Sequence, residues 1–314
     1  MKHIVIVGTG HAGLTLAREL RLKDEKCRLT LISKESICAY YKPNLSKALS
    51  TGKTADQLIL KTDATLSKEF NATCISHAEV TDINPIAQNL SYQAAESAQQ
   101  HSLNYDKLIL ATGASPIRLP NTLAAPEHIL SINTLSDYQY FRQRLEGKQS
   151  VVIIGAGYIG CELASDLSSQ GIKVSIIDRG AWPLSRAVPE AIGSVIQKEM
   201  SDKQAVDWHL GKTLKRVDAQ AQQFKVLLES GEQLTADLVV SAIGLQANTE
   251  LAKLASANTA LGIKVDSFSQ TSVSNIYALG DCAEYQEKLM PFIAPITLAA
   301  KALASTLCAD AKPL

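Results

Sequence analysis

Two glycine-rich segments of this sequence have the residue types and the spacing that bind a pyrophosphate group. In such a Gly-x-Gly-x-x-Gly pattern the first glycine permits a tight turn, the second lets the backbone approach the phosphates, and the third lets helix and strand pack closely. The phosphates then lie at the helix N-terminus, where free N–H groups favour negative charge. Two copies therefore predict two bound dinucleotides. The glycines are Gly8, Gly10 and Gly13 in the first copy, and Gly155, Gly157 and Gly160 in the second.

Each glycine pattern lies between the elements that must position it. An apolar run precedes it, a helical pattern of apolar residues follows it, and a second apolar run comes next, which predicts a strand, a turn, a helix and a parallel strand. The paired runs are 4–7 with 29–32 and 151–154 with 174–177. We also predict strands over 78–89 and 103–112 and a closing helix over 296–307. The residues inside the turns that we expect to contact the cofactors are His11, Ala12, Tyr158 and Ile159.

The residue that ends the second strand of each copy indicates which cofactor binds. In the second copy it is Asp178, whose carboxylate suits the hydroxyls of an adenosine ribose. A carboxylate there repels a 2′-phosphate, so NADH is favoured over NADPH, although the neighbouring Arg179 could offset this repulsion. In the first copy the aligned residue is Ser33, followed by Lys34, and the acid expected at this point is displaced to Glu35.

Composition and charge exclude several classes of protein. The 314 residues suffice for about two domains of roughly 150 residues each. Lys plus Arg equal Asp plus Glu at 31 each, whereas a dedicated nucleic-acid binder would carry a basic excess. Only the first 60 residues have one, with ten Lys and Arg against five Asp and Glu. No apolar stretch approaches the roughly 18 residues of a membrane span.

Cysteine and histidine spacing indicates neither a disulfide scaffold nor a metal site. The six cysteines form no Cys-x-x-Cys pair, and no Cys/His cluster has zinc-ligand spacing. We therefore expect a cytoplasmic protein without a bound metal. The six histidines have no partner spacing, and we expect them at the surface or in loops.

Further segments carry a resemblance to a known family. Gly280 and Asp281 end a strand-like run and resemble the second FAD fingerprint of the pyridine nucleotide–disulfide oxidoreductase superfamily. The segment 111–113 resembles the crossover motif of that superfamily, and 242–244 repeats it. The resemblance implies that the first copy binds FAD, with Asp281 accepting a hydrogen bond from a ribityl hydroxyl. The other residues expected at the two cofactors are Val80, Ala111, Thr112, Gly113, Ala242, Ile243 and Gly244.

The same resemblance implies an α/β fold of two Rossmann-like dinucleotide-binding domains, the second inserted in the first. We expect the FAD-binding domain to comprise 1–113 and 245–314, and the NADH-binding domain to comprise 114–244. Relatives usually continue into a small C-terminal α/β domain, which this sequence is expected to lack.

A narrower resemblance lies at residues 40–46, Tyr-Tyr-Lys-Pro-Asn-Leu-Ser, which are similar to the Tyr-x-Lys-Pro-x-Leu-Ser segment of bacterial rubredoxin reductases and their flavorubredoxin-linked relatives. It implies that Lys42, next to Pro43, lies against the flavin, where a cation would stabilise the negative charge of the reduced ring. Alternatively, Lys42 is a surface lysine, and Lys47 is a further candidate for the flavin face. The resemblance also implies a place for Glu162 near the flavin and the nicotinamide. Alternatively, Glu162, in the first turn of its helix, compensates the helix dipole.

Together these features imply an enzyme that passes electrons from NADH through FAD to rubredoxin or to the rubredoxin domain of a flavorubredoxin. The basic excess of the first 60 residues could steer a small acidic partner. Two alternatives stay open. Single-cysteine NADH peroxidases and coenzyme A-disulfide reductases of the superfamily keep a redox cysteine near the position of Cys38. A non-catalytic sensor would bind FAD and NADH without turnover.

Overall fold

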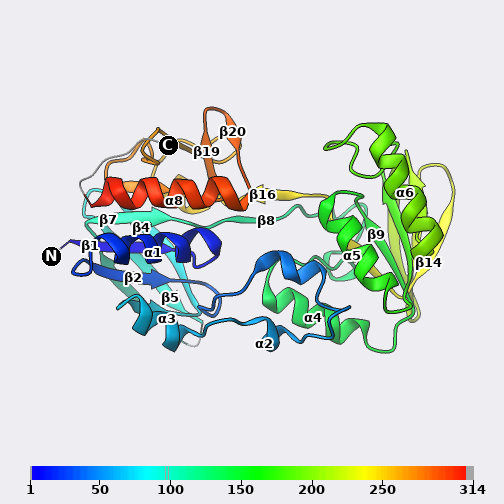
Figure 1. The fold of residues 1–314 in the computed structure, drawn as a ribbon, viewed down its shortest axis with the longest axis horizontal. Helices are drawn as coiled ribbons and strands as arrows, with labels where there is room; N and C mark the ends of the chain where they lie inside the picture. The colour runs from blue at the N-terminus through cyan, green and yellow to red at the C-terminus, as the bar shows by residue number, and fades with distance from the viewer. Residues whose placement is uncertain (1, 96, 98, 309–314) are drawn as a thin grey trace. The chain divides into compact units, whose positions relative to one another are not determined.

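The computed structural model describes residues 2–95, 97 and 99–308, which form two compact units of mixed helices and parallel sheets, as predicted (Figure 1). Unit 1 contains the chain up to Tyr40, the segment Ile59–Ser115 and the chain from Gln246 onward. Unit 2 contains Tyr41–Leu58 and Pro116–Leu245. The units differ from the expected domains mainly in Tyr41–Leu58, which was expected with the first segment of the FAD-binding domain and belongs to unit 2.

A five-stranded parallel sheet in the order β18-β7-β1-β2-β3 lies at the centre of unit 1. The predicted runs 4–7 and 29–32 are its adjacent strands β1 and β2. The strands are β1 (His3–Val7), β2 (Arg28–Ile32), β3 (Thr73–Ile75), β7 (Lys107–Leu110) and β18 (Ile276–Ala278).

Every residue of β1 is buried, because both faces of the sheet are covered. Ile4 and Ile6 belong to the core cluster that includes two helices, α1 and α8, which lie side by side (Figure 1). Val5 and Val7 point to the opposite face and share a core cluster with an antiparallel sheet, β4-β5-β6. The covering elements are α1 (His11–Lys23), α8 (Ile293–Leu307), β4 (Ala78–Asn84), β5 (Asn89–Ala94) and β6 (Gln100–Asn104).

The predicted strands in the middle of unit 1 are wrong in their bounds. The run 78–89 is not one strand, because the side chain of Asn84 accepts the backbone N–H groups of Ile86 and Ala87 and turns the chain back into β5. The run 103–112 is divided between β6 and β7. The closing helix is confirmed and begins at Ile293. The remaining elements are α3 (Asp63–Glu69), α7 (Glu250–Leu254), β17 (Ile263–Val265), β19 (Ala283–Tyr285) and β20 (Lys288–Leu289).

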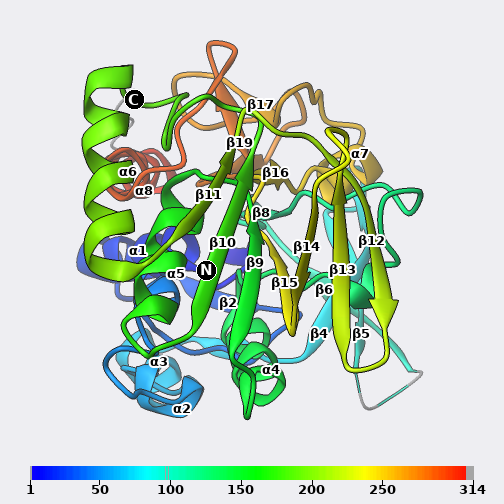
Figure 2. The ribbon, with the colours of Figure 1, turned by 90° about the vertical axis from the view of Figure 1, so that its right-hand side faces the viewer.

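Unit 2 contains a four-stranded parallel sheet in the order β11-β10-β9-β15 (Figure 2). The predicted runs 151–154 and 174–177 form β9 and β10. Val152 and Ile154 share a core cluster with an antiparallel sheet, β12-β13-β14. The elements are α4 (Leu135–Leu145), β9 (Ser150–Ile154), α5 (Tyr158–Ser168), β10 (Lys173–Asp178), α6 (Glu190–Gln204), β11 (Asp207–Leu210), β12 (Leu214–Gln220), β13 (Gln223–Leu228), β14 (Gln233–Ala236) and β15 (Leu238–Ser241).

Short elements complete the two units. A 3-10 helix, Lys42–Ser46, and α2 (Ala55–Leu58) lie in unit 2, as does a second 3-10 helix, Pro126–His128. Strands β8 (Ala114–Pro116) and β16 (Leu245–Ala247) pair, and each contains the point at which the chain passes from one unit to the other. Within the described ranges, no helix has the length and apolar character required to cross a membrane.

Candidate functional site

The first glycine turn joins β1 to α1 and has the geometry that a bound pyrophosphate requires. Gly8 has a φ of +101°, and an added Cβ there would clash with the carbonyl oxygen of Ala111. A Cβ on Gly13 would clash with the Gly8 carbonyl, so this glycine lets α1 pack on the turn. A Cβ on Gly10, by contrast, would meet no described atom within 4 Å. The middle glycine therefore borders open space that a bound phosphate could occupy.

The second turn, between β9 and α5, repeats this geometry. Gly155 has a φ of +112°, and an added Cβ would clash with the carbonyl oxygen of Ala242. Gly160 packs against the Gly155 carbonyl, while a Cβ on Gly157 would meet no atom within 4 Å in the described part of the chain. The predicted motifs 111–113 and 242–244 thus follow β7 and β15 directly and supply the carbonyl that each tight turn touches.

Both helix N-termini offer N–H groups for an anion. Gly10 is the N-cap residue of α1 and Gly157 that of α5; among the described residues no side chain caps either helix, and no acid lies in either first turn. Glu162 lies beyond the first turn of α5, so the expectation that it compensates the helix dipole from that turn is wrong. Without a competing carboxylate, each N-terminus can bind phosphate oxygens.

In unit 1 the structure brings two distant predicted segments together at the first turn. Gly280 has a φ of +87°, and an added Cβ would lie 2.7 Å from the Cβ of Ala12. Burial lowers the pKa of His11, and the charge of nearby Asp281 partly opposes this. The Gly280–Asp281 pair therefore lies beside the N-terminus of α1, and its contact with FAD stays a prediction.

The residues expected at the adenosine of the first cofactor follow β2. Ser33 accepts the N–H of Glu35 on its hydroxyl at 3.2 Å, and Lys34 lies 3.6 Å from Glu79 in an exposed ion pair. Lys34 and Glu35 are exposed, whereas Val80 is buried on β4. The contact of these residues with a ribose stays a prediction.

In unit 2, Asp178 ends β10 beside the second glycine turn. One carboxylate oxygen accepts the N–H of Ala156 at 2.6 Å, and the other accepts the N–H of Gly180 at 2.6 Å. Asp178 therefore holds the turn itself, a role that the sequence did not indicate. Arg179 is exposed.

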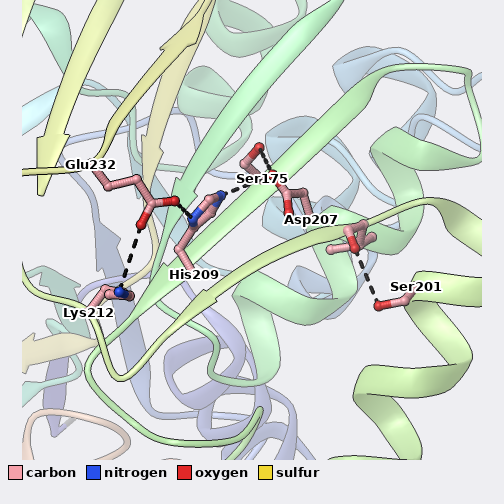
Figure 3. Close-up of polar contacts among 7 residues, drawn as sticks. Ser175, Ser201, Asp207, His209, Lys212 and Glu232 are labelled. Carbon is pink, nitrogen blue, oxygen red and sulfur yellow. Dashed lines mark hydrogen bonds and ion pairs between the residues drawn. The ribbon is translucent and has the colours of Figure 1, made fainter. Parts of the chain in front are cut away.

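Next to β10, a polar cluster surrounds His209 of β11 (Figure 3). Its Nε2 lies 3.0 Å from Asp207 Oδ2 and its Nδ1 lies 2.7 Å from Glu232 Oε1, while Lys212 Nζ lies 3.9 Å from Glu232 Oε2. Both contacts of the ring are hydrogen bonds only when the imidazole carries two protons. The expectation that all histidines lie at the surface or in loops is wrong, because His209 and His3 are buried within strands.

A third polar group forms around Glu162 on α5. Ser46 donates its hydroxyl to Glu162 Oε2 at 2.6 Å, and Lys47 Nζ lies 3.1 Å from Glu162 Oε1. Lys47, the further candidate for the flavin face, therefore contacts Glu162. Lys42 begins the 3-10 helix, with Pro43 as its second residue, and the role expected for it stays a prediction.

Burial is the main cause that raises the pKa of five of the six cysteine thiols, those of Cys38, Cys74, Cys161, Cys282 and Cys308. All six are free, and Cys38 is buried. Burial raises the pKa of the Cys38 thiol, and the negative charges of Glu35 and Asp63 raise it further. Burial likewise raises the pKa of Cys161 to about 12. Since the thiolate is the reactive form, this environment does not favour redox chemistry at Cys38.

Comparison with known proteins agrees with the geometry of the two turns. The chain matches the family described as pyridine nucleotide-disulphide oxidoreductase over residues 2–303. It is 39% identical over 314 residues to a rubredoxin-NAD(+) reductase of Acinetobacter baylyi, a match covering 99% of this chain and 79% of that protein. It is 37% identical over 315 residues to a nitric oxide reductase FlRd-NAD(+) reductase of Enterobacter sp., covering 100% and 81%.

Among solved structures, the covalent putidaredoxin reductase–putidaredoxin complex matches with a TM-score of 0.89 and 30% sequence identity, covering 99% of this chain and 76% of that chain. The family match, the relatives and the paired glycine turns all support the resemblance found in the sequence. This chain belongs to the pyridine nucleotide-disulphide oxidoreductase family.

Proposed function

We propose that this protein is an FAD-dependent enzyme that takes electrons from NADH and passes them to rubredoxin or to the rubredoxin domain of a flavorubredoxin. The observation that carries the proposal is the pair of glycine turns with closely similar geometry, one in each unit, in a chain 39% identical to a rubredoxin-NAD(+) reductase. When bound, FAD supplies the chemistry that links a two-electron donor to a one-electron acceptor.

Unit 1 would hold FAD. The open space at Gly10 and the uncapped N-terminus of α1 suit its pyrophosphate. Gly280 and Asp281 lie beside that N-terminus, where Asp281 would accept a hydrogen bond from a ribityl hydroxyl.

Unit 2 would hold NADH. Gly157 and the N-terminus of α5 suit its pyrophosphate, and Asp178 at the adjacent strand end suits the ribose hydroxyls. Both oxygens of Asp178 already accept one N–H each, and each retains a lone pair for a ribose hydroxyl. Its negative charge would repel the 2′-phosphate of NADPH, so the enzyme is expected to prefer NADH.

The Lys47–Glu162 pair would serve the transfer of the hydride. Glu162 lies one turn along α5 from the expected pyrophosphate site, and it orients the Lys47 ammonium at 3.1 Å. A cation at this position would stabilise negative charge that develops during transfer. We assign this role to Lys47 because its ammonium lies 3.1 Å from Glu162 Oε1.

The alternatives make different predictions. A peroxidase or disulfide reductase using Cys38 needs a thiolate, which the surroundings of Cys38 disfavour. A sensor would bind both cofactors without turnover. The cytoplasmic location expected from the cysteines stays a prediction.

The proposal is tested by mixing the FAD-loaded protein with NADH under anaerobic conditions and following the flavin absorbance. Rapid loss of absorbance with NADH, and slower loss with NADPH, is expected. Absorbance that is unchanged by NADH would contradict the proposal.

A further inference from the structure

The segment Tyr41–Leu58 is held on unit 2 by the carboxylate of Asp166, near the end of α5. Asp166 Oδ2 accepts the backbone N–H of Leu49 at 2.8 Å, and Oδ1 accepts that of Ser50 at 2.8 Å. Both oxygens thus bind the backbone two and three residues after Lys47. This contact fixes the course of the chain at the point where the lysine side chain leaves it.

The burial of Asp166 indicates that this contact is the main role of the residue. Only 4% of Asp166 is exposed, and a buried carboxylate is strongly unfavourable unless hydrogen bonds satisfy it. Its position in the last turn of α5 does not favour the helix, because negative charge there opposes the helix dipole. The two N–H groups of the segment are therefore what keep a carboxylate at this position.

Asp166 and Glu162 are four residues apart on α5 and so share one face of the helix. Glu162 contacts the side chains of Ser46 and Lys47, at 2.6 and 3.1 Å. Asp166 contacts the backbone a few residues further along the same segment. One helix face therefore sets both the path of the segment and the direction of its lysine.

A second anchor lies at the far side of the segment. Tyr138 of α4, which is fully buried, donates its hydroxyl to the carbonyl of Lys53 at 2.9 Å. Arg142 donates to the same carbonyl. This anchor lies six residues beyond Lys47 and does not involve Asp166, so it would keep the segment on unit 2 when the contact with Asp166 is lost.

We propose that Asp166 is a positioning residue that holds Lys47 against Glu162. The inference rests on the proposed function, in which this pair serves the transfer from NADH. Without the carboxylate, the N–H groups of Leu49 and Ser50 lose their partner, and Lys47 is no longer fixed beside Glu162.

The first test measures backbone hydrogen exchange in the FAD-loaded protein. The variant Asp166→Asn places an amide where one carboxylate oxygen was, so at least one N–H loses its acceptor. We expect the amides of Leu49 and Ser50 to exchange about ten-fold faster than in the wild type. The control is Asp56→Asn, which changes an exposed acid of the same segment and is expected to leave this exchange unchanged.

The second test measures flavin reduction by NADH over a range of NADH concentrations. Asp166→Asn is expected to lower the limiting rate about ten-fold, since small misplacements of a reacting group are costly, and to leave the half-saturating NADH concentration unchanged. Lys47→Met is expected to lower the limiting rate by at least as much. The double variant should be no slower than Lys47→Met alone, because Asp166 acts only through Lys47.

The outcomes separate the inference from the proposed function. If the wild type is not reduced by NADH, the proposed function fails and the inference falls with it. If the wild type is reduced but Asp166→Asn behaves like Asp56→Asn, or its effect adds fully to that of Lys47→Met, the inference alone is overturned. Should Asp166→Asn not fold, Ser50→Pro removes one of the two N–H donors, and its criteria are the exchange of the Leu49 amide and the limiting rate of flavin reduction.

Discussion

At the scale of single residues, carboxylates that accept backbone N–H groups shape unit 2. Asp178 accepts the amides of Ala156 and Gly180, so the residue expected at the ribose also holds the glycine turn. Removing its charge therefore has two effects on nucleotide binding. It ends the repulsion of a 2′-phosphate, and it loosens the turn that receives the pyrophosphate of either nucleotide.

We expect Asp178→Asn to bind NADH about ten-fold more weakly, the effect of losing roughly one hydrogen bond to a charged acceptor. Its affinity for NADPH should rise by less than that factor, because the loosened turn offsets the gain. Fluorescence titration with both nucleotides measures this, with the exposed Asp202→Asn of α6 as the control. Unchanged NADH affinity together with a large gain for NADPH would contradict this account and show that Asp178 acts only by repelling the 2′-phosphate.

The two lysines of the 3-10 helix region give a second residue-scale prediction. Lys47→Met removes the cation paired with Glu162 and is expected to lower the limiting rate of flavin reduction by about ten-fold or more. Lys42→Met is expected to lower it less. Stopped-flow measurements of flavin reduction by saturating NADH compare the two variants. A larger loss of rate in Lys42→Met would assign the role in hydride transfer to Lys42, the lysine that the sequence resemblance favours.

At the scale of elements, the two βαβ turns require glycine for different reasons at different positions. Gly8 has no room for a side chain because of Ala111, whereas Gly10 faces open space. A methyl group at Gly8 therefore strains the protein itself, while one at Gly10 obstructs only a bound phosphate. The same distinction applies to Gly155 and Gly157 in unit 2.

Gly8→Ala and Gly10→Ala are accordingly expected to differ when FAD is absent. Both should lose FAD, measured as the flavin-to-protein absorbance ratio. In FAD-free protein, Gly8→Ala should melt at a clearly lower temperature, since both its φ of +101° and the clash with Ala111 oppose folding. Gly10→Ala should melt near the wild type. Equal melting temperatures for the two variants would contradict the close approach at Gly8.

A further element-scale prediction concerns Asp237, which precedes β15. Burial would raise its pKa, but hydrogen bonds from the amides of Gln149 and Ser150 and the side chains of Gln223 and Ser150 outweigh burial and lower the pKa to about 2. Because the folded-state pKa lies below the ordinary value of 3.8, the ionised form contributes stability above about pH 4. This contribution is lost as the pH falls toward 2.

Asp237→Asn should therefore lower the free energy of unfolding by about 1 kcal/mol at pH 7, because solvent screens this partly exposed carboxylate. The difference from the wild type should shrink as the pH falls from 4 toward about 2, where the wild-type carboxyl also becomes protonated. Denaturant unfolding at several pH values measures it. A difference that is independent of pH over this range would show that charge on Asp237 is not the source of its effect.

The parts of the fold that were predictable are those whose strand, turn and helix signals lie close together along the chain. Strand β1, its glycine turn and α1 follow one another, and full burial on both faces makes 4–7 a continuous apolar run. The sheet β12-β13-β14 was not predicted, because its strands mix buried residues such as Val217 with exposed polar ones. The contacts of Glu162 with Lys47 and of His209 with Glu232 were equally hidden, since each joins segments distant in the sequence.

At the scale of the whole molecule, the basic residues of the first 60 positions lie in several separate parts of the fold. Arg21 and Lys23 lie at the end of α1, and Arg28 begins β2, so they lie at the edge where the parallel strands of unit 1 start. The Gly8 turn lies at the opposite edge, where the strands end. This group therefore does not surround the expected FAD site, whereas exposed Lys34 follows the end of β2 at the same edge as the Gly8 turn. Steering of an acidic partner would therefore involve Lys34 and the lysines of the segment Tyr41–Leu58.

The measurement that tests the central proposal most directly is electron delivery to rubredoxin. The FAD-loaded protein is reduced with NADH under anaerobic conditions and mixed with an excess of oxidised rubredoxin, and the iron chromophore is followed. We expect bleaching that continues over many turnovers until NADH is consumed. Flavin that is reduced by NADH while the rubredoxin chromophore stays unchanged would contradict rubredoxin as the acceptor.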